Sequence, residues 1–232
     1  MKRAIALLLA LVMVFALCGC NSKEKAERAE IEEKEAIQKE GYDAVKNAYG
    51  VIYDFSDNVY EVWRMAEYDV DGMLSNGVDQ IVERIEYNEV ASISKDQLVE
   101  ALCRTQYDNY DELSDAEKKT VTENVNGYFK HNYNHGQLPG YCVWSIMKAY
   151  EITGYTKMAE DELEKAKAAI KLLGEKYPDS EYYSKLKELY IAANALFEFC
   201  KAPTGSFKQY KTTENEYKNT IRDCMNTLDL LS

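Results

Sequence analysis

The sequence predicts an all-α protein, a bundle of about seven or eight helices with long, coiled-coil-like antiparallel hairpins. Three observations support this fold class. Apolar residues recur every three or four positions over much of the chain after residue 41, which is the period of one helix face. Several of these segments follow capping boxes, in which Ser precedes Gln or Glu by three positions. The 232 residues include only three prolines, and no segment has a convincing strand pattern.

Four periodic segments account for most of the expected core. The first begins at Val45 and continues to Ala66, with a nearly unbroken apolar seam that includes Ile52 and Phe55. The other three cover residues 159–177, 183–200 and 207–231. Within the last segment, Glu214 is the one polar residue at a seam position. Because no linker-like stretch follows residue 41, residues 41–232 are expected to form a single all-α helical domain.

The breaks between these segments contain residues that end or begin helices. Gly154 is expected to stop one helix and Thr156 to cap the next, and Pro178 with a Ser180 cap separates the following pair. The expected capping boxes are Ser94 with Gln97, Ser114 with Glu117, and Ser206 with Gln209.

The N-terminal segment has the features of a secretory signal peptide. Two basic residues precede an apolar run over residues 4–18, which is shorter than the roughly 20 residues that a membrane-spanning helix needs. Leu17-Cys18-Gly19-Cys20 then resembles the lipobox of bacterial lipoproteins. The resemblance implies that residues 1–19 are removed and that Cys20 carries a diacylglyceryl and acyl lipid. It also implies a lipid-anchored protein on the extracytoplasmic face of the cell membrane, with no other cofactor expected.

Residues 20–40 follow as the lipidated cysteine and a charged helical tether. Most residues after Ser22 in this segment are charged and the two signs alternate, which is typical of a solvated helix too polar to pack strongly. The whole chain has a formal net charge of −12 at pH 7. Such a charge repels nucleic acid and anionic lipid, so no nucleic-acid partner is expected and the acyl anchor is the expected membrane contact.

His131 and His135, the only histidines of the chain, stand four residues apart. On a helix they share one face and could hold a divalent metal. The intervening residues lack the glutamate of the zinc-protease signature, and the position one turn earlier is Gly127. Gly136 is placed to end this helix, so we interpret the pair as helix-end residues that suit the negative end of the dipole, while keeping them as candidate metal ligands.

The segment EYDVDGMLSNGV, residues 67–78, resembles half of an EF-hand calcium loop. The matching positions are Asp69, Asp71, Gly72 and Leu74. The twelfth position, where a bidentate acid belongs, is Val78. A helix-ending turn from Asp69 to Asp79 explains the same residues, and Asp69 and Asp71 remain the candidate calcium ligands.

Nothing in the sequence selects a catalytic centre. No phosphate-binding loop and no Gly-x-Ser-x-Gly occurs, and the Ser-x-x-Lys of Ser22 and Lys25 lies in the tether without companion motifs. The chain has 19 tyrosines against six phenylalanines. At helical spacing these indicate the margins of a slender bundle, with an aromatic groove for sugar or peptide as the alternative. We therefore predict that the protein is not an enzyme.

The sequence leaves two hypotheses for the function. The first is a non-catalytic binding or interaction module of the bacterial envelope, anchored by lipid, whose protein partner the sequence does not identify. The alternative is a small-ligand or metal-binding receptor lipoprotein centred on His131 and His135 or on the Asp69 to Asp79 turn.

Four cysteines remain after the expected processing, and the last two lie on neighbouring helices. A straight hairpin would place Cys200 and Cys224 about 24 Å apart along its axis, well beyond the roughly 7 Å that a disulfide spans. We predict no bridge between them. The pairing of Cys103 with Cys142 is left open.

Overall fold

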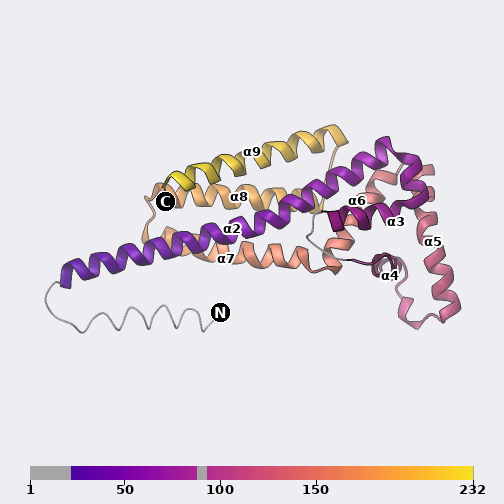
Figure 1. The fold of residues 1–232 in the computed structure, drawn as a ribbon, viewed down its shortest axis with the longest axis horizontal. Helices are drawn as coiled ribbons and strands as arrows, with labels where there is room; N and C mark the ends of the chain where they lie inside the picture. Colours follow the sequence, from indigo (N-terminus) through magenta and orange to yellow (C-terminus); the bar gives the residue numbers. More distant parts are fainter. Residues whose placement is uncertain (1–21, 88–92, 232) are drawn as a thin grey trace.

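A computed structural model describes residues 22–87 and 93–231, and these residues form an all-α bundle (Figure 1). The fold class predicted from periodicity is therefore confirmed, and no strand occurs in the described residues. The helices, in chain order, are α2 (Ser22–Tyr68), α3 (Val70–Tyr87), α4 (Lys95–Gln106), the short 3-10 turn η2 (Tyr110–Glu112), α5 (Asp115–Asn134), α6 (Leu138–Ile152), α7 (Tyr155–Lys176), α8 (Glu181–Lys201) and α9 (Phe207–Leu231).

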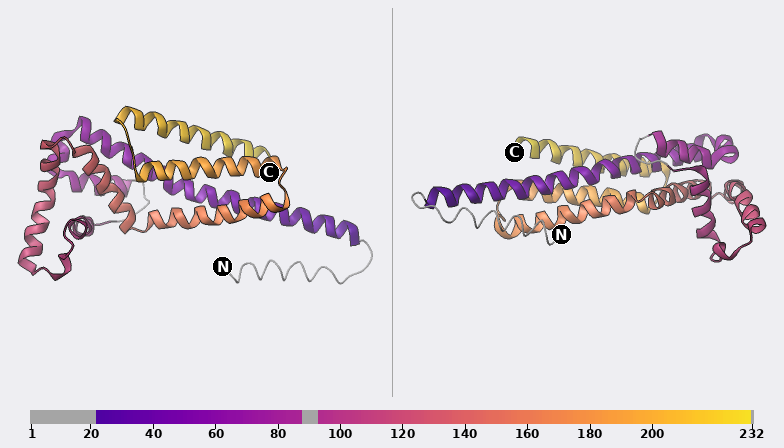
Figure 2. Two further views of the ribbon diagram at one scale, coloured as in Figure 1. Left: turned by 180° about the vertical axis from the view of Figure 1, so that it is seen from behind. Right: turned by 60° about the horizontal axis from the view of Figure 1, so that its bottom comes forward.

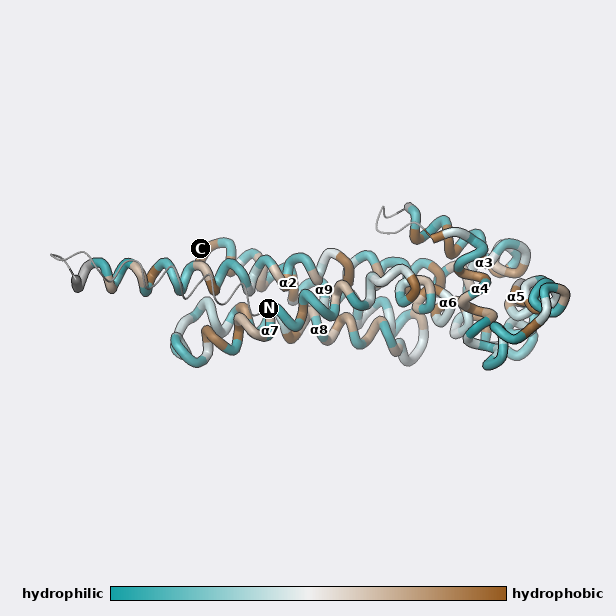
Figure 3. Tube along the Cα trace, turned by 90° about the horizontal axis from the view of Figure 1, so that it is seen from below, coloured by the Kyte–Doolittle hydropathy of each residue, from teal (hydrophilic) through white to brown (hydrophobic). Residues whose placement is uncertain are grey.

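Four long helices, α2, α7, α8 and α9, lie side by side along the long axis of the molecule (Figures 1 and 2). The shorter helices α3 to α6 gather at one end, next to the last turns of α2. Within the long part, α2 packs mainly on α7 and α9 mainly on α8. Apolar and polar residues alternate along each helix (Figure 3), as a bundle with few wholly buried positions requires. In the described part of the chain, no helix combines the length and the apolar character needed to cross a membrane.

The predicted seams form the core. In α2, Val45, Ile52 and Val59 have no exposed surface, and Phe55 has almost none. The seams of the other long helices are buried in the same way, through Leu163, Ala166, Leu173, Leu186, Ala193, Phe197, Tyr210, Ile221 and Leu228. The alternation of threes and fours thus identified most of the residues that face the core, although Leu231 is exposed and the α8 seam is centred on Tyr182 and Leu189 rather than on Tyr183 and Tyr190.

Helix α2 passes through residue 41, where the tether was expected to end, without a break. Packing also begins before that residue. The Lys176 ammonium lies 2.5 Å from the Glu33 carboxylate, and the Tyr177 hydroxyl donates to the Glu30 carbonyl at 3.3 Å. Ile37 is buried. The second half of the expected tether is therefore held against the end of α7.

Most of the predicted helix ends are confirmed. All three capping boxes form, including the bond from the Ser206 amide to Gln209 Oε1 at 2.8 Å. Gly136 has a φ of 68° directly after α5. Gly154, with a φ of 79°, is itself the N-cap of α7, so the prediction of Thr156 as the cap was wrong. Ser180 occupies the N-cap of α8 without a capping side-chain hydrogen bond.

The hairpin of α8 and α9 separates Cys200 from Cys224. Cys200 Sγ lies 3.5 Å from the Tyr210 hydroxyl, whereas Cys224 is hydrogen-bonded to Glu188. Glu188 and Cys200 are three helical turns apart on α8, which is about 18 Å. The two thiols therefore face different levels of the hairpin, as its predicted register requires. Cys103 and Cys142 are also buried and unbridged.

Candidate functional site

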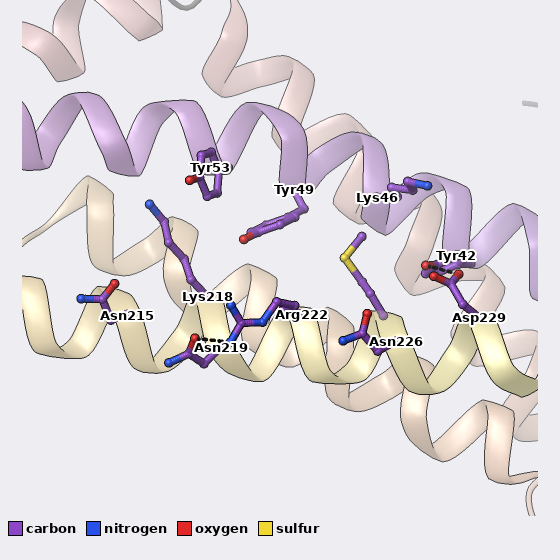
Figure 4. A pocket seen from close by; sticks show the side chains of 11 residues that line it. Tyr42, Lys46, Tyr49, Tyr53, Asn215, Lys218, Asn219, Arg222, Asn226 and Asp229 are labelled. Atoms are coloured by element: carbon purple, nitrogen blue, oxygen red, sulfur yellow. Dashed lines mark hydrogen bonds between the residues drawn. The ribbon is translucent and has the colours of Figure 1, made fainter.

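A groove of about 650 Å³ runs between α2 and α9 (Figure 4). It arises because these two helices touch only sparsely, while each packs closely on another neighbour. Helix α2 contributes Tyr42, Lys46, Tyr49 and Tyr53, and α9 contributes Asn215, Lys218, Asn219, Arg222, Met225, Asn226 and Asp229.

Polar bridges join the two helices near each end of this groove. Ser56 Oγ donates to Glu214 Oε1 at 3.0 Å, and Tyr42 Oη donates to Asp229 Oδ1 at 2.7 Å. The earlier residue on α2, Tyr42, pairs with the later residue on α9, so the two helices are antiparallel. The two bridges are separated by nearly the same number of residues along each helix, so the helices stay in register between them. The bridges are about 21 Å apart along the axis. The groove is thus a defined part of the fold rather than a gap between loosely associated helices.

Glu214, the polar residue at a seam position, belongs to a nearly buried ion pair. Lys218 Nζ lies 2.7 Å from Glu214 Oε1, and the two side chains are only 14% and 5% exposed. The same ammonium lies 4.1 Å from the centre of the Tyr53 ring. Lys218 is therefore committed to α2 and to its own helix, and it forms one wall of the groove.

The groove is cationic in an acidic chain. Its lining holds Lys46, Lys218 and Arg222 against the single carboxylate of Asp229, whereas the whole chain has a net charge of −12. Arg222 Nη2 donates to Asn219 Oδ1 at 2.8 Å, which orients the guanidinium. Among the described residues, no carboxylate lies within 4.0 Å of the side-chain nitrogens of Lys46 or Arg222.

Tyrosines line the α2 side of the groove. Tyr49 and Tyr53 meet edge to face with 5.8 Å between ring centres. In Figure 4, Lys218 extends from α9 toward the Tyr53 ring, whereas Arg222 runs along α9 to Asn219. Burial, together with neighbouring Tyr53, raises the pKa of Tyr49 to about 12. Burial and the Asp229 carboxylate also raise the pKa of Tyr42. These phenols are neutral at physiological pH and can donate hydrogen bonds.

The α9 side adds amides. Asn215 and Asn219 are exposed on adjacent turns of that helix and Asn226 is exposed two turns farther on, and each carries donors and an acceptor on one planar group. The lining thus combines cations, amides and aromatic rings. It contains no Ser, Thr, Cys or His that could act as a nucleophile or general base. This set of groups is suited to binding a polar ligand.

The histidine pair lies far from the groove, at the end of α5. Ring centres of His131 and His135 are 4.5 Å apart, and both residues are exposed. His135 is the C-cap, and its amide donates to the His131 carbonyl at 3.2 Å. The described residues contain no group of three or more His, Cys, Asp or Glu side chains placed to hold a metal. The structure brings the two imidazoles together without a third ligand.

The turn predicted from Asp69 to Asp79 is wrong, because this segment is helical. Two residues interrupt the helical backbone, Asp69 between α2 and α3 and Asn76 at a kink inside α3. The amide and carbonyl of Asp69 still bond to Met65 and Met73 at 2.8 and 3.1 Å. Asp79 is paired with Lys95 at 2.7 Å. An EF-hand loop around Asp69 and Asp71 is therefore not formed.

The glycines of this segment have a different role. A Cβ on Gly77 would lie 2.5 Å from the nearest ring carbon of Phe129, so the missing side chain lets α3 approach α5. The only non-helical backbone inside α3 is at Asn76, with φ of −140° and ψ of 29°. Close packing, rather than a loop, accounts for glycine at this position.

Cys20 and the lipobox lie in residues 1–21, outside the described residues. Lipidation of Cys20 therefore stays a prediction. No protein-family model, curated protein or solved structure matches this chain.

The groove itself was not located from the sequence, although an aromatic groove was considered. Its signal is a second face of α2, on which Tyr42, Lys46, Tyr49 and Tyr53 follow one another at steps of four, three and four residues beside the apolar seam. The tyrosines fall into two groups by position. Tyr150 and Tyr210 are buried in the core, whereas the groove tyrosines lie at its margin.

Proposed function

We propose that this chain is a lipid-anchored, extracytoplasmic, non-catalytic binding module of the bacterial envelope, and that the groove between α2 and α9 is its binding element. One observation carries the proposal. Arg222, held by Asn219, lies in a groove between two bridged helices and has no carboxylate partner among the described residues. A cation placed in this way on an acidic protein is available to an anionic group of a ligand.

The chain order supports a location of the groove away from the bilayer. With a lipid on Cys20, α2 would begin two residues from the anchor and lead outward over its 47 residues, a length of about 70 Å. The groove would then begin near Tyr42, roughly 30 Å along this helix. Helices α3 to α6 would lie farthest from the membrane. A binding groove at this height is accessible to molecules of the cell envelope.

Phase partitioning tests the anchor. Cys20→Ala should move the protein from the detergent phase to the aqueous phase, or leave it as uncleaved precursor, because the acyl chains supply the lasting membrane affinity. Unchanged partitioning together with normal processing would contradict the lipoprotein assignment.

Photocrosslinking in intact cells tests the groove. A photoreactive residue at position 215, which lines the groove and leaves Asn219 and Arg222 in place, should give an adduct of increased mass, and the same residue at exposed Lys171 on α7 should not. Adding Arg222→Gln to the first variant should reduce the adduct. Equal labelling at both positions, or none at position 215, would contradict a binding function of the groove.

A further inference from the structure

We infer that the groove between α2 and α9 binds an acidic saccharide, that is, a sugar ring that carries a carboxylate, and this inference rests on the proposed binding function. It follows from three groups that line the same groove: the guanidinium of Arg222, the ring of Tyr49 and the amides of α9.

The charged end of the ligand is assigned to Arg222. A guanidinium stays protonated and offers a planar pair of donors that matches a carboxylate. Asn219 already accepts one Arg222 hydrogen at 2.8 Å, which limits the orientations of the guanidinium and leaves its other donors for a ligand. Lys46 lies farther along the groove, beside the Tyr42 ring, and adds positive charge at that end. Lys218 is not assigned this role because its ammonium is already paired with the Glu214 carboxylate.

The ring of the ligand is assigned to Tyr49 and Tyr53. A sugar has C–H faces that pack on an aromatic ring and a rim of hydroxyls that need hydrogen-bond partners. Tyr49 is half-buried, lies level with Arg222 across the groove, and is braced edge to face by Tyr53. A sugar held by Arg222 could therefore lie against this ring. The neutral Tyr49 hydroxyl can also donate to the ligand without repelling its charge.

The hydroxyl rim is assigned to Asn219 and Asn226. Each amide presents a donor and an acceptor side by side, which suits neighbouring hydroxyls that both donate and accept. The two residues flank Arg222 on the adjacent turns of α9. A simple anion would use the guanidinium but neither the amides nor the aromatic ring, whereas a neutral sugar would leave the guanidinium without an anionic partner.

Isothermal titration calorimetry of the full-length chain in zwitterionic detergent micelles tests this assignment. The probes are glucuronate, glucose, acetate and a short oligogalacturonate. Glucuronate should bind at least tenfold more tightly than glucose or acetate, and its affinity should fall as salt is added. Tighter binding of the oligomer would identify a polymeric glycan as the source of the ligand, and equal binding would identify a single acidic sugar.

Matched variants assign the binding to the groove. Arg222→Gln should weaken glucuronate binding about tenfold, because a charge-assisted hydrogen bond is lost. Arg28→Gln, the same change at an exposed position outside the groove, should leave the affinity unchanged. Far-ultraviolet circular dichroism shows whether both variants keep the helical fold.

The outcomes separate this inference from the function on which it rests. Equal affinity for acetate and glucuronate would show that the site does not recognise the sugar ring. Equal affinity for glucose and glucuronate would show that the site does not recognise the carboxylate. Either result would overturn the inference. No binding of any probe, with a position-215 adduct still formed in cells, would overturn the inference and leave the binding function standing. If neither calorimetric binding nor a crosslinked adduct were found, both the saccharide inference and the proposed binding function would be overturned.

Discussion

Ser56 on α2 donates a hydrogen bond to Glu214 on α9, with 3.0 Å between the hydroxyl and carboxylate oxygens. The same carboxylate oxygen accepts from Lys218 at 2.7 Å in a nearly buried pair. Removing one partner of such a pair leaves the other charge desolvated without compensation. Glu214→Leu should therefore lower the free energy of unfolding by about 3 kcal/mol, as measured by urea denaturation.

A double variant provides the control for this ion pair. Glu214→Leu combined with Lys218→Met removes both charges and keeps the volume, so most of the lost stability should return. Similar stability of the single and double variants would mean that Lys218 reaches solvent when Glu214 is absent, and that the pair is not what holds α9 on α2.

Two glycines inside helices should respond in opposite directions to alanine. Gly77→Ala places a methyl group less than 3 Å from three ring carbons of buried Phe129, and this overpacking should destabilise the fold by about 2 kcal/mol. Gly50→Ala meets nothing within 4 Å and should stabilise α2 by about 1 kcal/mol through helix propensity. Thermal melts of both variants check this. Stabilisation by Gly77→Ala would show that α3 does not pack this closely on α5.

The histidine pair should contribute little to stability. His131 and His135 are exposed at the end of α5, so changing both to Gln should cost about 1 kcal/mol or less at neutral pH, as expected for lost interactions with the helix dipole. Micromolar zinc should shift the melting temperature of the wild type and of the variant equally. A zinc-dependent rise found only in the wild type would support a metal site there.

The sequence was sufficient to predict most of the helices, but it was not sufficient to predict the groove. The two cases differ in their physical reason. A seam such as Val45, Ile52 and Val59 depends only on the period of a helix, and capping boxes such as Ser94 with Gln97 depend only on neighbours in the chain. The groove depends on which helices become neighbours. Tyr49 and Arg222 are far apart in the sequence, and the register of α9 on α2 brings them together.

Local rules failed where packing opposed them. Gly, Asp and Asn between residues 69 and 79 favour a turn, yet the segment remains helical because α3 packs on α5 through Gly77 and Phe129. The same applies to the charged residues before Gly41. Their composition favours a solvated tether, but Ile37 and the contacts of Glu30 and Glu33 with α7 bring the second half of that segment into the bundle.

Alkaline pH should unfold the protein through its buried phenols and thiols. Burial raises the pKa of Tyr141 and Tyr182 to about 12 and that of Cys142 and Cys200 to about 12, from ordinary values near 10 and 9. Each raised pKa means that the folded state holds the proton more tightly than the unfolded chain does. The corresponding stability is complete below pH 9 and is lost as the pH rises from about 9 toward 12.

Cysteine replacement measures this effect directly. For Cys200 the loss at pH 11 should be roughly 3 kcal/mol, so the free energy of unfolding of Cys200→Ala should fall less steeply between pH 9 and 11 than that of the wild type. The variant should start from a lower stability at pH 7, because a buried side chain is shortened. Urea denaturation at several pH values gives both slopes. Equal slopes would mean that the Cys200 thiol titrates in the folded protein as it does in the unfolded chain, and that the α8 and α9 interface is open to water at that level.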